Sequence, residues 1–326
     1  MALHGAAGTH VDGDGSRSGG GRFGTVAFIG CGLIASSMIR AMKRAGLARR
    51  FLVVEKTEAR ARHVVGLGLA DRASADPALV GEAELVVVAV PMGAYDEVAA
   101  AIAPHLRPGA ILTDVGSTKR LAIEAFCRHI AHPERIVPGH PVAGTEHSGP
   151  EAGFAELFAG RWTILTPLPE TAQEACARVA ALWRALGAEV EIMDPVHHDR
   201  VMAVVSHIPH LIAYTIVGTA SHLEEVSERE VMKYAAGGFR DFTRIAASDP
   251  VMWRDIFLAN RDAVFDMLAA LKADLARLER AMAEGDGKAL EDWFRRTRAI
   301  RRGVLEIERR TGAAVPGDSL TGEKRG

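Results

Sequence analysis

A polar, glycine-rich segment, Gly139–Gly149, contains the histidine best suited to acid–base chemistry. The segment is GHPVAGTEHSG, and the preceding residues 135–137 (RIV) are typical of a strand. We therefore expect His140 directly at the end of a strand, where Pro141 restricts the backbone. A neutral imidazole there is suited to take a proton from a substrate hydroxyl while a hydride leaves the same carbon. The alternative is a histidine that only caps an element or fills the core.

Two clusters in the second half of the chain suit the recognition of an anionic substrate. VVSHIPH places His207 and His210 three residues apart on one face of a predicted helix, which Pro209 should kink. GGFRDFTR presents Arg240 and Arg244, whose guanidinium groups suit carboxylates, although arginines are more often only solvated. The histidine pair also allows a metal site, but no nearby carboxylate or thiolate completes one, and we expect no metal.

The first strand candidate runs into a dinucleotide-binding fingerprint. TVAFI is followed by GCGLIA, which is G-x-G-x-x-A between a strand and a helix. The first glycine permits the tight turn, the second lets a pyrophosphate approach the helix N-terminus, and the alanine allows close helix–strand packing. A plain structural turn is the alternative. We expect the cofactor to contact Gly30, Gly32, Leu33, Ile34 and Ala35.

Glu55 favours NAD as the cofactor. It closes the second predicted strand, where an acidic side chain binds the 2′-hydroxyl of the adenosine ribose and repels a 2′-phosphate. Lys56, Arg60 and Arg62 follow and are suited to a 2′-phosphate, so NADP stays the less favoured alternative.

Two more strand ends are expected at the same edge of the sheet. Pro91 follows the apolar run Leu85–Val90, and Ser117 lies in DVGSTK after the run Ala110–Thr113. Ligands of open parallel sheets bind outside the carboxyl ends of the strands. We therefore expect Pro91 to contact the cofactor, and the hydroxyls of DVGSTK to face the nicotinamide and the substrate.

Strands and helices alternate through the first half of the chain, which predicts a mostly parallel, Rossmann-like α/β domain over residues 25–194. The predicted strands are Thr25–Ile29, Phe51–Val54, Leu85–Val90, Ala110–Thr113, Arg135–Val137, Trp162–Thr166 and Glu189–Met193. The predicted helices are Leu33–Ala45, Ala59–Leu67, Gly93–Ala103, Lys119–Ala131 and Ala172–Leu186.

The strand patterns stop after Pro195, and an all-helical domain is predicted over residues 195–310. Its helices are His197–Ser221, Glu225–Tyr234, Asp241–Ala247, Pro250–Glu284 and Gly287–Arg310. An apolar stripe at helical spacing runs along Leu268, Leu271, Leu275 and Leu278. Because no linker separates the halves, we expect two packed domains with a cleft between them, and a helical surface that faces a second subunit in a homodimer.

The composition excludes several classes of protein. The chain has 326 residues, is 48% hydrophobic and carries a formal net charge of −2. It therefore has no excess of positive charge that would indicate binding to nucleic acid or to an acidic membrane surface. The apolar run Leu85–Val90 has strand length and is far too short to span a membrane. The three cysteines lie far apart and indicate reduced thiols in a cytoplasmic protein. Residues 1–24 and 311–326 are expected to be flexible tails.

These motifs together resemble the prephenate/arogenate dehydrogenase family of tyrosine biosynthesis. The resemblance covers roughly Val26 to Leu278 and rests on GCGLIASS, DVGSTK, GHPVAGTEHSG, WTILTP, VVSHIPH and GGFRDFTRIAASDPVMWRDI in this order. It implies a Rossmann domain with an all-helical dimerisation domain, and NAD-dependent oxidative decarboxylation of prephenate, arogenate or both. Hydride leaves the ring carbon that bears the 4-hydroxyl, CO₂ leaves the opposite carbon, and the aromatic product is 4-hydroxyphenylpyruvate or tyrosine.

The resemblance also implies roles for single residues. His140 stands where the catalytic histidine binds the ring hydroxyl, and Ser117 where a serine orients it. Arg244 matches an arginine that binds a substrate carboxylate. The other positions that line or gate the substrate pocket are His207, His210, Arg240, Thr145 and Glu146.

Two other functions stand beside this one. A dehydrogenase of the 3-hydroxyacid or 6-phosphogluconate type also joins a Rossmann domain to helices, but it relies on a catalytic lysine, for which Lys233 is the nearest candidate. A catalytically silent NAD-sensing dimer needs no set such as His140, Ser117 and Arg244. The sequence does not separate prephenate from arogenate, because both carry the same ring carboxylate and hydroxyl.

Overall fold

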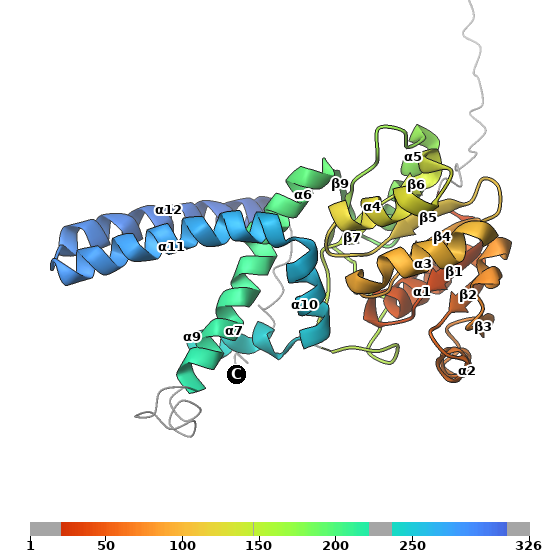
Figure 1. The fold of residues 1–326 in the computed structure, drawn as a ribbon, viewed down its shortest axis with the longest axis horizontal. Coiled ribbons are helices and arrows are strands. Elements are labelled where there is room, and N and C mark those ends of the chain that lie inside the picture. Colours follow the sequence, from red (N-terminus) through yellow and green to blue (C-terminus); the bar gives the residue numbers. More distant parts are fainter. Residues whose placement is uncertain (1–20, 146, 222–236, 312–326) are drawn as a thin grey trace, which may run out of the picture.

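The computed structural model describes residues 21–145, 147–221 and 237–311, which form an α/β part and a helical part (Figure 1). Glu146, the predicted helix Glu225–Tyr234 and the terminal segments 1–20 and 312–326 lie outside the described residues. A long hairpin of two helices, α11 (Arg261–Ala283) and α12 (Gly287–Thr311), extends away from the α/β part.

The central sheet has six parallel strands in the order β3-β2-β1-β4-β5-β6, which confirms the predicted Rossmann-like fold. The sequence does not predict β3, because this edge strand is only three residues long and reads RAS. Strand order reverses between β1 and β4, and this reversal opens a crevice at their carboxyl ends. The strands are β1 (Phe23–Ile29), β2 (Ala48–Val54), β3 (Arg72–Ser74), β4 (Leu85–Val88), β5 (Ile111–Asp114) and β6 (Ile136–Val137).

Helices cover both faces of this sheet. One face carries α1 (Leu33–Ala45) and α5 (Gln173–Ala185), and the other carries α3 (Tyr95–Ile102) and α4 (Arg120–His129). A further helix, α2 (Glu58–Gly66), connects β2 to β3 and packs beside them. Both faces of the central strands are therefore buried, as the apolar composition of β4 predicts.

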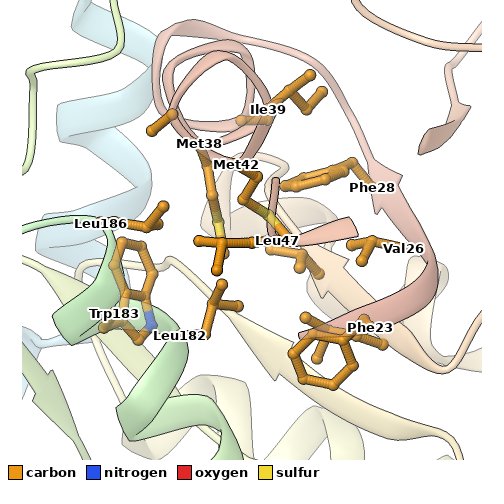
Figure 2. Packing of buried hydrophobic residues seen from close by; sticks show 14 of the residues in the cluster. Phe23, Val26, Phe28, Met38, Ile39, Met42, Leu47, Leu182, Trp183 and Leu186 are labelled. Carbon is orange, nitrogen blue, oxygen red and sulfur yellow. The ribbon is translucent and has the colours of Figure 1, made fainter. Parts of the chain in front are cut away.

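Alternation along β1 supplies both layers of the core. Val26 and Phe28 point to the face that carries α1 and α5, while Ala27 and Ile29 point to the opposite face. Figure 2 shows the first layer, in which Trp183 of α5 lies across from the methionines of α1. This packing fixes the start of α1, and with it the glycine loop that precedes the helix.

His140 lies in a second, smaller sheet, which corrects its predicted place at the end of a strand. β7 (Gly139–Pro141) pairs antiparallel with β8 (Trp162–Leu165), and β8 pairs in parallel with β9 (Glu189–Ile192). Pro138 separates β6 from β7, because a proline cannot donate a hydrogen bond to a ladder. His140 is therefore held in register opposite Ile164, within a strand.

The first long helix of the helical part is interrupted before its proline. α6 (Pro195–Met202) continues through a π-helical turn, Ala203–His207, into α7 (Ile208–Ser221). The sequence predicts a kink at Pro209, and the structure has a π-helical turn just before this residue. Proline lacks the N–H that a regular helix needs, so the helix changes its hydrogen-bond pattern there.

The helices that follow are shorter than the apolar periodicity of the sequence predicts. α9 (Gly237–Thr243) is followed by a 3₁₀ turn, Arg244–Ala247. The predicted helix Pro250–Glu284 is two helices, α10 (Pro250–Ala259) and α11, because the chain turns at Asn260.

Much of the helical surface is apolar in the single chain. Leu258, Phe265 and Ile300 are each at least 60% exposed. The helical run Pro195–Ala220 is also long and apolar enough to cross a membrane by length and composition alone, a test that helices of soluble proteins pass as well. Within the described residues the buried apolar cluster of this part is small and centres on Ala203, Ile208 and Val264.

Candidate active site

The loop between β1 and α1 has the geometry of a phosphate-binding turn. Gly30 has a φ of +80°, and a Cβ there would lie 2.9 Å from the carbonyl oxygen of Ala89, so only glycine fits. A Cβ on Gly32 would meet no atom within 4 Å, so the space beside the first turn of α1 is open. Gly32 is also the N-cap of α1 and has no side chain to occupy the first amides. These amides and the helix dipole suit the pyrophosphate of a dinucleotide.

Glu55 orders this loop. Its Oε1 accepts a hydrogen bond from the amide of Cys31 at 2.8 Å, and its Oε2 accepts from the amide of Lys56 at 3.2 Å and lies 3.3 Å from Nε of Arg60. A carboxylate has about four acceptor sites, so one remains for a ribose hydroxyl. Burial and the Glu55 charge raise the pKa of the Cys31 thiol to about 12, which makes Cys31 a packing residue.

His140 begins a chain of hydrogen bonds that crosses from the α/β part to the helical part. Its Nδ1 lies 2.9 Å from Nε2 of His198, and Nδ1 of His198 lies 2.8 Å from Oδ1 of Asp199. All three side chains are buried, and the two rings meet edge to face at 5.1 Å. Asp199 also accepts hydrogen bonds from the amides of Lys119 and Arg120 at the start of α4.

The direction of this chain determines where the protons are. A carboxylate only accepts, so Nδ1 of His198 carries a proton and its Nε2 has a lone pair. That lone pair accepts from Nδ1 of His140, and Nε2 of His140 is therefore left unprotonated. Burial lowers the pKa of His140 well below its ordinary value, with further lowering from His198 and Lys119. His140 is thus a neutral base at physiological pH, with its lone pair on the nitrogen opposite the chain.

A buried ion pair fixes the backbone that carries His140. Nζ of Lys119 lies 2.5 Å from Oδ2 of Asp114 and donates to the carbonyl of Gly139 at 2.5 Å. Oδ1 of Asp114 accepts from the amide of Gly139 at 3.0 Å, and the hydroxyl of Tyr95 donates to Oδ2. DVGSTK therefore clamps both backbone groups of the residue before His140, and this leaves the imidazole little freedom.

A second group of rings faces the helical side of the site. His210 stacks on Trp253 with ring centroids 3.7 Å apart, and His207 meets the same indole edge to face at 6.0 Å. Nδ1 of His210 donates to the carbonyl of Ser206 at 2.9 Å, and Nδ1 of His207 lies 3.1 Å from Nδ2 of Asn260. Burial lowers the pKa of both histidines, and the charge of Arg244 lowers that of His210 further. The pair is neutral, and Arg244 lies near it.

The other predicted site residues have fewer contacts and are mostly half-buried or exposed. Ser117 is half-buried two residues before Lys119, and Pro91 is exposed where β4 leads into a 3₁₀ turn. Thr145 is exposed, and its hydroxyl accepts a hydrogen bond from the amide of His147. Ala35 is buried at the base of α1, whereas Leu33 and Ile34 are half-buried. Arg240 and Arg244 are exposed in the single chain, and Glu146 lies outside the described residues.

Sequence reasoning missed the partners of His140. His198 and Asp199 lie in PVHHDR, where two histidines and an aspartate in the first turns of a helix that starts with a proline are the available signal. Asp114 and Lys119 lie in DVGSTK, where the sequence indicates roles for the hydroxyls and backbone amides but not for these two charged side chains. Asn260 gives no local signal, because its role depends on residues far away in the sequence.

Two family models together match most of the chain. The nucleotide-binding domain of prephenate dehydrogenase matches residues 38–192, and the dimerization domain of prephenate dehydrogenase matches residues 194–296. Among curated relatives, a cyclohexadienyl dehydrogenase of Zymomonas mobilis is 41% identical over 86% of this chain and 95% of its own length. A prephenate dehydrogenase of Bacillus subtilis is 32% identical over 86% of this chain and 76% of its own length.

Solved structures agree with these matches. A prephenate dehydrogenase of Aquifex aeolicus, in complex with hydroxyphenyl propionate and NAD⁺, superimposes with a TM-score of 0.80 at 31% identity and covers 86% of this chain and 98% of that one. An arogenate dehydrogenase of Synechocystis has a TM-score of 0.73 at 24% identity, over 86% of this chain and 99% of that one, which is a likeness of fold.

Proposed function

Since this chain belongs to the prephenate dehydrogenase family, we propose that it oxidises prephenate, arogenate or both with NAD and releases CO₂. The product is 4-hydroxyphenylpyruvate from prephenate and tyrosine from arogenate. The observation that carries this proposal is the chain from Asp199 through His198 to His140, which leaves an unprotonated Nε2 on a buried, neutral imidazole. Oxidation of a hydroxyl-bearing carbon needs such a base.

The residues of the site divide the proton movement among them. Nε2 of His140 takes the proton of the ring hydroxyl as a hydride leaves the same carbon and the C–O bond gains double-bond character. The electrons of the breaking C–CO₂ bond then aromatise the ring, and the ring oxygen takes the proton back to give the phenol. NAD supplies the hydride acceptor when it is bound. The positive charge that appears on His140 is stabilised by Nε2 of His198, which in turn is oriented by Asp199. Ser117 orients the same hydroxyl.

Arginines and histidines bind the rest of the substrate. Arg244 binds a carboxylate, and its position near His210 supports this role. Arg240 adds positive charge on the exposed side of α9. His207 and His210 line the pocket around the side chain that differs between the two substrates. By the resemblance to the family, Thr145 and Glu146 line or gate this pocket.

NAD is the expected cofactor because the glycine loop fits a pyrophosphate and Glu55 retains one acceptor site. Gly30, Gly32, Leu33, Ile34 and Ala35 hold the pyrophosphate, and Pro91 contacts the nicotinamide end. The solved Aquifex relative carries NAD⁺, which supports this choice. NADP is disfavoured, since a 2′-phosphate would meet the carboxylate of Glu55.

We also infer that the protein is a cytoplasmic homodimer, with its two domains dividing at Asp194. The exposed apolar side chains of α10, α11 and α12 need a cover, and a second copy of the dimerisation domain provides one. The apolar run Pro195–Ala220 supplies His198, Asp199 and His207 to the active site, which supports its burial in protein and not in lipid. We expect no nucleic acid or membrane partner.

The decisive experiment measures steady-state formation of NADH or NADPH by the purified protein with prephenate or arogenate, each with NAD or NADP. Turnover of either substrate with NAD supports the proposal, and the four ratios give the substrate and cofactor preference. A folded protein that binds NAD but turns over neither substrate would refute it and favour an NAD sensor or another hydroxyacid substrate. His140→Asn serves as the matched control, because it separates the enzyme's own turnover from a contaminating activity.

A further inference from the structure

Asn260 occupies a helix N-cap position but does not use its side chain to cap the helix. It precedes α11, and asparagine is among the residues most favoured at that position because its side-chain oxygen caps the free amides. Here the side chain makes no cap hydrogen bond to α11. Its Nδ2 instead donates to the carbonyl oxygen of Asp199 at 2.7 Å and lies 3.1 Å from Nδ1 of His207. The side chain is diverted to the active site.

The two contacts fix the orientation of the amide and the tautomer of the histidine. A carbonyl oxygen only accepts, so the group of Asn260 that faces Asp199 is the NH₂ group and not the oxygen. The NH₂ group has a second hydrogen, and that hydrogen is the one directed at Nδ1 of His207. Nδ1 of His207 must therefore carry a lone pair, and its proton is on Nε2.

The tautomer of His207 matters because the ring is buried and neutral. Its ring is 1% exposed and meets the rings of Trp253 and Phe257 edge to face. Burial lowers the pKa of His207 to about 4. The charge of Asp199 acts in the other direction and raises this pKa, whereas His198 and His210 lower it further. His207 therefore stays neutral, and a neutral ring offers only one N–H.

The neighbouring histidines have the opposite arrangement. Nδ1 of His140 donates toward His198 and Nδ1 of His210 donates to the carbonyl of Ser206, so both rings have a bare Nε2 when neutral. His207 is thus the ring of the three that has its N–H on Nε2.

We propose that Asn260 is a positioning residue that holds His207 as a neutral Nε2–H donor for an oxygen atom of the substrate. The tautomer follows from the contacts of Asn260 alone, whereas the substrate oxygen rests on the proposed function. The same amide holds the carbonyl of Asp199, so one side chain ties the donor to the segment that orients the base. An oxygen acceptor is the chemistry shared by the carboxylates and the keto group of the cyclohexadienyl substrates.

The first test reads the tautomer directly. The full-length protein is labelled with ¹⁵N-histidine, and the His207 signals are assigned by their loss in His207→Gln. We expect a neutral ring protonated at Nε2 in the wild type from pH 8 down to pH 5.5. In Asn260→Asp a carboxylate faces Nδ1 and can only accept, so we expect the proton to move to Nδ1. A wild-type ring protonated at Nδ1, or the same tautomer in both proteins, would overturn the proposal.

The second test reads the consequence for the substrate. Loss of one neutral hydrogen bond to the substrate is worth about a tenfold change, so KM for the accepted cyclohexadienyl substrate should rise about tenfold in Asn260→Asp and Asn260→Ala. KM for NAD should stay within about twofold, because Asn260 belongs to the helical part.

Asp249→Ala is the matched control for these variants. Asp249 is a true N-cap, since its Oδ1 accepts from the amide of Met252 at the start of α10. Its replacement removes the N-cap of the neighbouring helix α10 and leaves both hydrogen bonds of Asn260 in place. An equal rise of KM in this control would show that Asn260 acts only through stability. A wild type that has the expected tautomer but turns over neither substrate would refute the proposed function and leave the assignment of Asn260 intact.

Discussion

Acidification should destabilise this protein through His207. The unfolded imidazole has an ordinary pKa near 6.5, whereas burial lowers the folded pKa to about 4. The unfolded chain therefore binds more protons between these values, and the free energy of unfolding falls as the pH falls below about 6.5. The contribution of His207 is complete above that pH.

The size of the effect follows from the two pKa values. At pH 5 the unfolded ring is almost fully protonated and the folded ring is almost fully neutral. The interval of about 1.5 pH units below 6.5, at about 1.4 kcal/mol for each unit, gives a loss of about 2 kcal/mol. His207 is 1% exposed, so solvent does not reduce this value much.

Urea unfolding at pH 7.5 and pH 5, at one fixed protein concentration, measures the loss. The wild type should lose about 2 kcal/mol more than His207→Gln over this interval, because the glutamine does not titrate. His197→Gln, which removes an exposed histidine from α6, should lose as much as the wild type. Equal losses in the wild type and His207→Gln would refute the burial of a neutral ring at this position.

Three further variants test the site itself. His140→Asn should lower kcat by about 10²- to 10⁴-fold while KM for the substrate changes modestly, since it removes the general base; a near-normal kcat in steady-state assays would mean that another group takes the proton. Arg244→Gln should mainly raise KM for the substrate, by about tenfold or more, and a normal KM would exclude the carboxylate role. Gly32→Val should fold normally, because its Cβ enters open space, yet raise KM for NAD at least about tenfold; unchanged NAD binding in a titration would contradict the pyrophosphate position.

Local patterns predict the α/β part well. The apolar run of β4, the alternation along β1 and the glycine turn before α1 are each encoded within a few consecutive residues, and all appear in the structure. The short strand β7 is not predictable in this way, because Gly139–Pro141 pairs with a strand more than twenty residues away and has no alternation of its own. The sequence therefore predicts His140 at a strand end, whereas it lies inside β7.

The candidate site is predictable only in part, for the same reason. Residue types near a strand end identify His140, and spacing identifies the pair His207 and His210. His140 and His198 are 58 positions apart, and His207 and Asn260 are 53 apart, so their pairing is a property of how the domains pack. Apolar periodicity also continues through Asn260, which explains why one helix is predicted where α10 and α11 meet at a turn.

The position of the hydrogen-bond chain has a consequence for how such a protein can evolve. His140 belongs to the nucleotide-binding module, while His198 and Asp199 belong to the first helix of the other module. If the Rossmann module were replaced by that of a distant dehydrogenase, the new module would supply a cofactor site. It would also need a histidine at the position of His140 to meet His198. Recombination at the boundary thus separates the base from the residues that tune it, and selection on turnover keeps the two modules inherited together.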